Sequence, residues 1–315
     1  MDINNEIAKL DWKREPYGLY EPIEYTLAAG GKRVRPQLAM IACQMFGGKE
    51  EEVLPAALAL EVFHNFTLLH DDVMDKADVR RGRPTVHVKW NENTAILSGD
   101  QMLIEAYKLL SGVPTDKLPR VLQLFNKMAT EICEGQQYDV DFESQEAVNI
   151  EEYLHMIRLK TSVLLGTALQ IGAYIAGADQ EAQRAIYDFG INVGLAFQIQ
   201  DDILDVWGDP ATFGKAVGGD IACNKKTFVF LTALQMADID HRRTLENWYS
   251  RVLTDNTQKI AAVKSIFKAV GVRKTCEEKV KDYTETAMAI LANLPQNAAT
   301  KELRKLAQQL HTRTV

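Results

Sequence analysis

The stretch Leu68-Leu69-His70-Asp71-Asp72-Val73-Met74-Asp75 decides how the rest of the chain is interpreted. It ends an apolar run, and Asp78 adds a fourth carboxylate shortly after it. A helix places these carboxylates within about two turns of one another. Each pair of like charges three or four residues apart costs a helix roughly 0.2–0.5 kcal/mol. Such crowding of carboxylates predicts a compensating cation.

A second stretch of the same kind is Phe197-Gln198-Ile199-Gln200-Asp201-Asp202-Ile203-Leu204-Asp205. One isolated motif of this type is most often a solvated, acidic helix end. Two of them, each preceded by an apolar helix, favour a functional role instead. An aspartate at the C-terminal end of a helix also meets the unfavourable pole of the helix dipole, which a purely structural role would avoid.

Carboxylate oxygens and water are the ligands that Mg²⁺ prefers, and proteins usually share this ion with substrate phosphates. Two acidic triads facing each other would hold a cluster of Mg²⁺ ions bridged by a diphosphate. The predicted metal-binding residues are Asp71, Asp72, Asp75, Asp201, Asp202 and Asp205.

The composition is that of an ordinary globular protein. The 315 residues are 46% hydrophobic and 25% charged, with a net charge of −7 that argues against a general nucleic-acid binder. The four cysteines are widely spaced without a CxxC pair, which favours reduced thiols in a cytoplasmic protein. The start of the sequence does not resemble a signal peptide. The stretch closest to a membrane span, 164–178, is too short, so no integral membrane segment is expected.

Helical spacing of apolar residues runs along nearly the whole chain. The expected helices cover about 20–29, 36–46, 50–74, 94–110, 118–142, 149–169 and 182–206, and several amphipathic helices follow residue 227. Residues 209–226 are rich in glycine and charge, which predicts a mobile loop or lid. No linker marks a boundary. The sequence therefore predicts one all-α domain, 1–315, of roughly ten helices.

Two basic segments complement the acidic motifs. Gly30-Gly31-Lys32-Arg33-Val34-Arg35-Pro36 combines flexible backbone with three cations, and Arg80-Arg81-Gly82-Arg83-Pro84 follows the first acidic motif closely. Arginine and lysine at such positions suit a diphosphate, which the guanidinium group binds through two hydrogen bonds at once.

The chain resembles the trans-isoprenyl diphosphate synthases, also called polyprenyl synthases, in a set of segments that occur in this order: 30–36, the first acidic motif with the basic segment 80–84, Lys160-Thr161, the second acidic motif, and Gly214-Lys215 to Thr227. The resemblance extends from about Tyr20 to the C-terminal helices. It implies a helical bundle around a central cavity (the isoprenoid synthase fold), about three Mg²⁺ ions per site and a homodimer. The implied substrates are isopentenyl diphosphate and an allylic diphosphate: dimethylallyl, geranyl or farnesyl diphosphate.

The resemblance also assigns roles to residues. Lys32, Arg35, His64 and Arg81 match positions that hold isopentenyl diphosphate, and Arg80, Lys160, Lys215 and Lys225 match positions that bind the allylic diphosphate. Thr161 and Gln198 match residues whose oxygens face the developing allylic cation. The sequence departs from the family pattern at Gly219, where many members have lysine, and at Asn224, where many have glycine.

The implied reaction is a head-to-tail, all-trans extension by five carbons. Cations and Mg²⁺ would stabilise the departing diphosphate, and lid closure would exclude water. The first motif is preceded by a small residue four positions before it (Thr67) and an aromatic residue five positions before it (Phe66). This pattern resembles that of family members that form C20 products. Phe66 and Phe63 lie roughly 7 and 12 Å along the helix axis from Asp71, at about 1.5 Å per residue. We expect geranylgeranyl diphosphate (C20), with farnesyl diphosphate (C15) as the next choice, although both phenylalanines could equally serve core packing.

Two other functions share some of these features. A terpene cyclase has the helical fold and the first acidic motif, but its second metal motif differs and it lacks the segment 30–36. A catalytically silent partner subunit of a heteromeric synthase usually loses one acidic motif, and both are present here. The pair His70-Asp71 also occurs in metal-dependent phosphohydrolases, which need further histidines.

Overall fold

The structure is a computed structural model that describes residues 2–209 and 217–311, with side chains described as far as residue 309. Helices dominate the described residues, which confirms the predicted all-α class. The chain divides into two compact units. The first comprises Met1–Phe125, Ala168–Gln183 and Asn297–Ala299, and the second comprises Asn126–Thr167, Arg184–Gln296 and Thr300–Val315.

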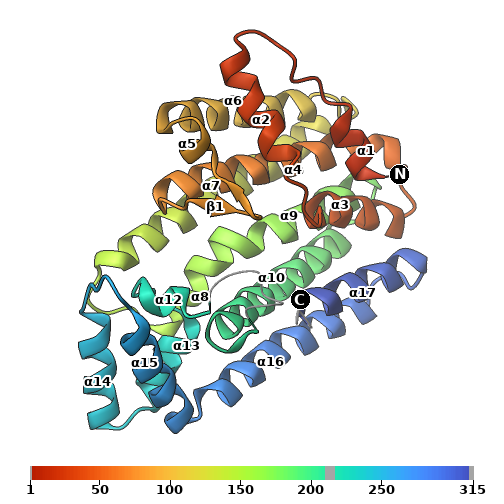
Figure 1. Ribbon diagram of the computed structural model, residues 1–315. Coiled ribbons are helices and arrows are strands. Elements are labelled where there is room, and N and C mark those ends of the chain that lie inside the picture. The colour runs from red at the N-terminus through yellow and green to blue at the C-terminus, as the bar shows by residue number, and fades with distance from the viewer. Residues whose placement is uncertain (1, 210–216, 312–315) are drawn as a thin grey trace. The chain divides into compact units, whose positions relative to one another are not determined.

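The elements follow one another in a helical succession that is labelled in Figure 1. From the N-terminus to the middle of the chain they are α1 (Ile3–Ala8), α2 (Tyr17–Leu27), α3 (Val34–Met45), α4 (Glu50–Met74), β1 (Val79–Arg80), β2 (Arg83–Pro84), α5 (Val86–Lys89), α6 (Glu92–Leu110), α7 (Leu118–Ser144), α8 (Ile150–Ile157), the π-helix η1 (Arg158–Ser162) and α9 (Val163–Ile175). The remaining elements are α10 (Gln180–Trp207), α12 (Gly219–Ala222), α13 (Phe228–Met236), α14 (Ile239–Tyr249), α15 (Thr257–Val270), α16 (Val272–Ala292) and α17 (Ala298–His311).

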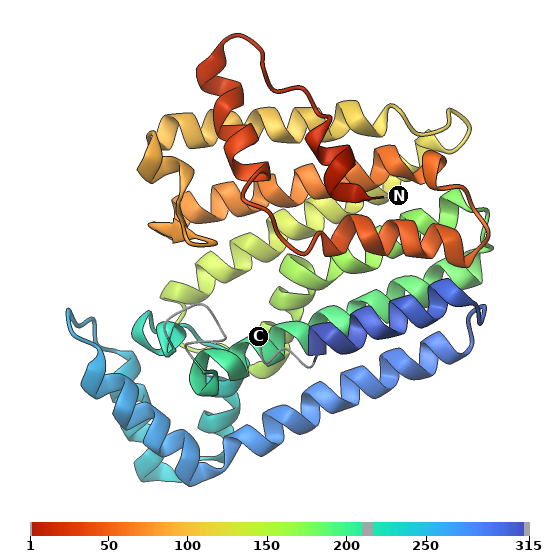
Figure 2. The same ribbon diagram turned by 45° about the vertical axis from the view of Figure 1, so that its right-hand side comes forward.

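Helix α4 is the core of the first unit. It packs between α3 and α6, which lie alongside it in Figure 2, while α2 crosses α6. A Cβ atom on Gly99 of α6 would lie 2.2 Å from His70 Nε2, so the absence of a side chain at this position lets the two helices approach closely. Among the described helices, α4 is long enough and apolar enough to cross a membrane, and its most apolar window has a mean hydropathy of 1.3. The stretch 164–178, which came closest in the sequence, does not meet the same test. However, 67% of the α4 window is buried within the protein, as in a core helix.

The second unit is built around α10. Residues of α10, α16 and α17 line one small apolar pocket, and the three helices run side by side in Figure 2. Helix α8 begins with a capping box, in which Asn149 Oδ1 accepts from the Glu152 backbone and the Glu152 side chain accepts from the Asn149 backbone, each at 2.8 Å. The capping box satisfies backbone donors that a helix N-terminus would otherwise leave unpaired.

The structure contains more helical segments than the roughly ten expected, because several regions form short helices such as α1, α5 and α12. A further feature is the antiparallel hairpin β1–β2 at residues 79–84, which lies between the expected helices. Arg81 (φ 52°) and Gly82 (φ 72°) both adopt the left-handed conformation. Two such central residues form the tight turn that suits a two-residue hairpin loop.

Gly172 offers a test of the packing between α9 and α3. A Cβ atom at this position would lie 2.0 Å from the Ala39 carbonyl oxygen, a backbone atom that cannot rotate away. We expect Gly172→Ala to lower the free energy of unfolding by about 1–3 kcal/mol, as for other overpacked cores. Denaturant unfolding measures the change.

The control is Gly18→Ala in the exposed first turn of α2, where an added Cβ meets nothing within 4 Å. This substitution should be neutral or stabilising, by up to about 1 kcal/mol, because alanine favours the helix. Equal destabilisation by both variants would contradict the close approach of α9 and α3.

Candidate functional site

The first acidic motif, residues 71–75, lies where α4 leaves the core. Asp71 and Asp72 occupy the last turn of α4, and Asp75 is its C-cap residue. Asp71 is half-buried and Asp75 is exposed, whereas Asp72 is buried. The three carboxylates therefore differ in their access to solvent, which the sequence pattern alone did not indicate.

Asp72 is paired within the protein. Its Oδ1 accepts a hydrogen bond from Arg80 Nε at 2.8 Å, which attaches the hairpin to α4. Burial raises the pKa of Asp72, and the Arg80 guanidinium opposes that rise. Asp72 and Arg80 were predicted to bind metal and diphosphate separately, but in this structure they bind each other.

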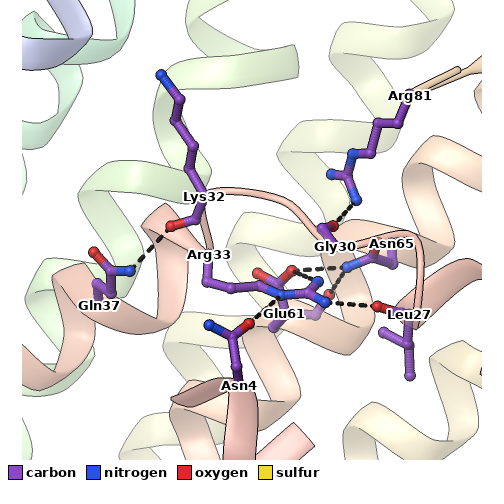
Figure 3. A network of polar contacts seen from close by, with 9 residues as sticks. All are labelled: Asn4, Leu27, Gly30, Lys32, Arg33, Gln37, Glu61, Asn65 and Arg81. Carbon is purple, nitrogen blue, oxygen red and sulfur yellow. Dashed lines mark hydrogen bonds and ion pairs between the residues drawn. The ribbon is translucent and has the colours of Figure 1, made fainter. Parts of the chain in front are cut away.

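A basic cluster forms where the segment 30–36, which we call the basic loop, approaches the hairpin. Arg81 donates a hydrogen bond to the Gly30 carbonyl, as Figure 3 shows, and its guanidinium lies against Gly31. Gly31 has φ 134°, and a Cβ atom there would lie 3.0 Å from the guanidinium carbon. Glycine at this position is therefore required both by the backbone conformation and by Arg81.

His64 lies beneath this cluster on α4. Burial, together with Arg35, Arg81, Arg80 and Arg33, holds the pKa of His64 well below its usual range. The imidazole is therefore neutral at pH 7 and can donate one hydrogen bond without adding charge. The predicted residues His64, Arg35 and Arg81 are thus close neighbours in the first unit, and Lys32 is exposed on the same loop.

The pocket beside this cluster opens between α2, α4 and the hairpin. Its lining includes Asn65, Leu68 and Asp72 of α4 together with Arg80 and Arg81. Cationic side chains therefore line a cavity of the first unit.

The second acidic motif, residues 201–205, lies in the last two turns of α10 in the second unit. Asp202 is buried, and its Oδ2 accepts hydrogen bonds from Tyr153 Oη at 2.6 Å and from the Phe228 backbone at 3.0 Å. Burial, followed by the charge of Asp220, raises the pKa of Asp202, and the pKa of Tyr153 is raised as well. Asp202 therefore connects α10 to α8 and to the first turn of α13.

Asp205 is also engaged within the second unit. Its Oδ2 accepts from the Asp220 backbone at 3.1 Å, and its carbonyl oxygen accepts from Gly218 at 2.6 Å. A Cβ atom on Gly219 would lie 3.3 Å from Asp205 Oδ1. The departure from the family pattern at Gly219 thus coincides with close packing of α12 on this carboxylate. Asp201, by contrast, is half-buried.

The segment Lys160-Thr161 lies in the π-helical turn η1, which interrupts the single long helix expected from residue 149. Gly135 of α7 makes room for this turn, since a Cβ atom there would lie 2.4 Å from the Lys160 backbone nitrogen. Single π-helical turns occur frequently at functional sites. Thr161 Oγ1 donates to Gln198 Oε1 at 3.3 Å, so the two residues predicted to face an allylic cation are in contact.

Asp139 and Lys259 had no predicted role, but Asp139 contacts a predicted site residue and Lys259 contacts Asn224, where the sequence departs from the family pattern. Asp139 Oδ2 accepts from Lys160 Nζ at 2.6 Å. Lys259 is fully buried and donates to the Asn224 side chain and, at 3.3 Å, to the Ala222 carbonyl. Asn224 has φ 59°, a left-handed conformation that glycine adopts easily. The asparagine side chain, unlike glycine, accepts the hydrogen bond from Lys259. No local signal in the sequence links Lys259 to residue 224.

The predicted lid lies only partly within the described residues. Residues 217–226 contain α12, which packs on α15 and is held by Asp205 and Lys259. Lys225 follows Asn224, and its backbone donates to the Asp220 carbonyl at 2.9 Å. Lys215 lies outside the described residues.

The predicted chain-length residues lie on α4 in the first unit. Phe63 is 1% exposed and packs edge-on against Phe125 with ring centroids 5.1 Å apart, so it is a core residue. Phe66 is half-buried between Phe63 and His70, at centroid distances of 5.5 and 4.8 Å. Thr67 is half-buried and donates its hydroxyl to the His64 carbonyl at 2.8 Å.

Within residues 2–209 and 217–311, no group of three or more His, Cys, Asp or Glu side chains is arranged to hold a metal ion. Asp71 and Asp75 nevertheless offer oxygen donors at the accessible end of α4, and Asp201 does so on α10. Mg²⁺ is usually bound through one or two carboxylates together with substrate phosphates. Within each unit, the donors of its own motif suit an ion that is held with its substrate.

The all-α architecture and the aspartate motifs at the ends of two long apolar helices define an isoprenoid synthase fold. The sequence profile of the family named "Polyprenyl synthetase" matches residues 16–270. Geranylgeranyl diphosphate synthase of Methanosarcina mazei is 43% identical over 222 residues, which is 70% of this chain and 68% of the relative. Geranylfarnesyl diphosphate synthase of Aeropyrum pernix is 38% identical over 290 residues, 90% of each chain.

A solved structure, geranylgeranyl pyrophosphate synthetase from Pyrococcus horikoshii Ot3, superposes with a TM-score of 0.92 at 36% identity and covers 99% of this chain and 95% of its own. The chain belongs to the polyprenyl synthetase family. It is a prenyl-chain-elongating enzyme, a trans-prenyltransferase of the short-chain type, as the motifs predicted.

The turn η1 gives a test of how Lys160 and Thr161 are positioned. Gly135→Ala should displace the η1 backbone, because the nearest atoms to the added Cβ are backbone atoms of residues 159 and 160. Misplacement of catalytic groups by about 1 Å can cost a hundredfold in rate. We expect kcat to fall by about that factor, as measured by steady-state prenyl transfer.

Gly166→Ala is the matched control in the same unit, because its added Cβ would meet mainly the Tyr187 ring, at 3.0 Å. It should reduce stability more than turnover. A Gly135→Ala variant with the kcat of the wild type would show that η1 does not position the reacting groups.

Proposed function

We propose that this enzyme condenses isopentenyl diphosphate with an allylic diphosphate (dimethylallyl, geranyl or farnesyl diphosphate) to form all-trans geranylgeranyl diphosphate. The observation that carries the proposal is the basic cluster of the first unit, in which Arg35, Arg81 and a neutral His64 lie together. Four arginines act on that one imidazole, which makes this a strongly positive region on an otherwise acidic chain. Such a cluster is suited to a diphosphate.

Isopentenyl diphosphate is assigned to Lys32, Arg35, His64 and Arg81. Lys32 extends from the basic loop, and Arg35 follows three residues later at the start of α3. The guanidinium groups would bind two diphosphate oxygens at once, and the ammonium would act as a point charge. The neutral His64 would donate a single hydrogen bond.

The allylic diphosphate is assigned to the two acidic motifs through Mg²⁺, with Asp71, Asp75 and Asp201 as direct ligands and about three ions in the site. When bound, Mg²⁺ would act as a Lewis acid that stabilises the negative charge of the departing diphosphate. Asp72, Asp202 and Asp205, whose carboxylates also accept hydrogen bonds within the protein, would support the direct ligands. Lys160, Lys215 and Lys225, with Arg80, would add positive charge.

In the reaction, the allylic C–O bond breaks and its electron pair leaves with the diphosphate. The double bond of isopentenyl diphosphate attacks the allylic carbon, a C–C bond forms, and loss of one proton restores a double bond. The oxygens of Thr161 and Gln198, which are in contact, would stabilise the allylic cation. The departing diphosphate is the proposed proton acceptor.

The first test measures condensation directly. Purified protein with Mg²⁺, labelled isopentenyl diphosphate and each allylic primer should give an extended product, and removal of Mg²⁺ by a chelator should abolish it. Asp71→Ala and Asp201→Ala should each lower kcat by about two to four orders of magnitude, because transition-state charge stabilisation is lost.

Lys9→Ala, at the exposed C-cap position of α1, is the control and should not affect the rate. Wild-type rates for either aspartate variant would contradict the metal assignment. A cyclic hydrocarbon formed from the allylic diphosphate alone would instead indicate a terpene cyclase, and no extension with any primer would indicate a non-catalytic subunit.

We assign the control of product length to Phe66. Phe63 is buried in the core, whereas Phe66 is half-buried. Phe66 directly precedes Thr67, which lies about one helical turn before Asp71. The relatives are named for geranylgeranyl and geranylfarnesyl products, so membership of the family alone does not determine the length. An aromatic side chain at this depth would stop the growing chain near C20, and farnesyl diphosphate is the alternative.

Phe66→Ala should therefore lengthen the main product by at least one five-carbon unit, because the ring no longer limits the space for the prenyl tail. Phe63→Ala serves as the comparison, and it should lower stability by about 3–5 kcal/mol as a core truncation. Chromatographic sizing of the products decides the point. An unchanged product distribution in Phe66→Ala would remove this residue from the role.

We also infer a homodimer and a cytoplasmic location. Helix α6 exposes Ile96, Leu97 and Ile104, which suits contact with a second copy of the chain.

A further inference from the structure

Arg33 behaves differently from the other cations of the basic loop. Its side chain is only 4% exposed, and each of its three guanidinium nitrogens donates a hydrogen bond. Nη1 donates to Glu61 Oε1 at 2.6 Å, Nη2 to the Leu27 carbonyl at 2.6 Å, and Nε to Asn4 Oδ1 at 3.3 Å. Figure 3 shows the Lys32 side chain extending away from this guanidinium.

The backbone of the loop requires such anchoring. Three of the four residues 30–33 have positive φ: Gly30 (75°), Gly31 (134°) and Arg33 (48°). A residue with a side chain rarely adopts this conformation unless the surroundings hold it there. The bond from Arg33 to the Leu27 carbonyl ties the loop to the end of α2, and the bond to Glu61 ties it to α4.

Glu61 is itself held in one orientation. Its Oε1 accepts a second hydrogen bond, from Asn65 Nδ2 at 2.9 Å, and Asn65 also donates to the Glu61 carbonyl at 2.8 Å. Glu61 interrupts an otherwise apolar run on α4 and is 2% exposed. Its negative charge offsets the repulsion between Arg33 and Arg81. The same helix carries His64, so the carboxylate fixes the loop relative to that imidazole.

We propose that Arg33, through its buried ion pair with Glu61, is a positioning residue for isopentenyl diphosphate. It does not contact the substrate. It holds the basic loop so that Lys32 and Arg35, on either side of it in the sequence, are presented to the diphosphate together with His64 and Arg81. This inference rests on the proposed function.

The first test is Arg33→Lys. Lysine keeps the charge that Glu61 needs but cannot reproduce the guanidinium fork that also reaches Leu27 and Asn4. We expect KM for isopentenyl diphosphate to rise about tenfold, the size of effect that follows from displacing one charge-assisted hydrogen bond. KM for the allylic diphosphate and kcat should change less than about twofold, because only binding of one substrate is affected.

The second test separates positioning from stability. Removing one partner of a buried ion pair is strongly destabilising, but replacing both with apolar residues is often neutral. The double variant Arg33→Met/Glu61→Met should therefore regain most of the Tm lost by Arg33→Met alone. Its KM for isopentenyl diphosphate should nevertheless stay raised. If the pair served stability only, Tm and KM would both recover.

Arg14→Met is the matched control, because Arg14 Nη1 is 3.0 Å from Glu105, a buried glutamate of the same unit that is remote in sequence from the basic loop. It should leave both KM values unchanged. If the wild type fails to extend any primer, the proposed function is wrong. If the wild type is active and the Arg33 variants keep its KM for isopentenyl diphosphate, the positioning role alone is wrong.

Discussion

The burial of α4 is the constraint on which the first unit depends. Because α3 and α6 cover this helix, its apolar residues form the core, and its two ends reach solvent. The acidic motif occupies the C-terminal end. A helix that is both the core and the support of a charged motif cannot shift easily, since any movement of the carboxylates would disturb close-packed side chains.

Buried charge then determines what each aspartate can do. Asp72 is bonded to Arg80, and Asp202 is bonded to Tyr153 and to the Phe228 backbone. Both carboxylates would be costly to bury without these partners. In each acidic motif the second aspartate therefore joins structural elements, while the first remains more accessible. Two motifs that look uniform in sequence therefore contain aspartates that differ in burial.

The second constraint is the close approach of neighbouring segments to the backbone, which is possible where the residue is glycine. Gly31 accommodates the Arg81 guanidinium, Gly99 accommodates His70, and Gly135 accommodates the backbone of η1. The last of these coincides with Lys160 and Thr161, so the π-helical turn and the predicted catalytic residues share one location. Asp139 and Lys259 act in a comparable way, because each binds a segment distant from it in sequence.

The sequence by itself determined the all-α class, the capping box at Asn149, the two acidic motifs and the family. These features depend on residue spacing along one helix or on local order, which a linear pattern records directly. Only the tertiary structure decided that Arg33 is buried while Lys32 is exposed, that Asp72 and Asp202 are bonded internally, and that the chain turns through a π-helix at Lys160. Several of these outcomes depend on a partner far away in sequence, 28 residues for Arg33 and Glu61 and 49 for Tyr153 and Asp202. Charge neutralisation in the interior selects those partners, and the sequence near a residue does not show which partner packing will bring to it.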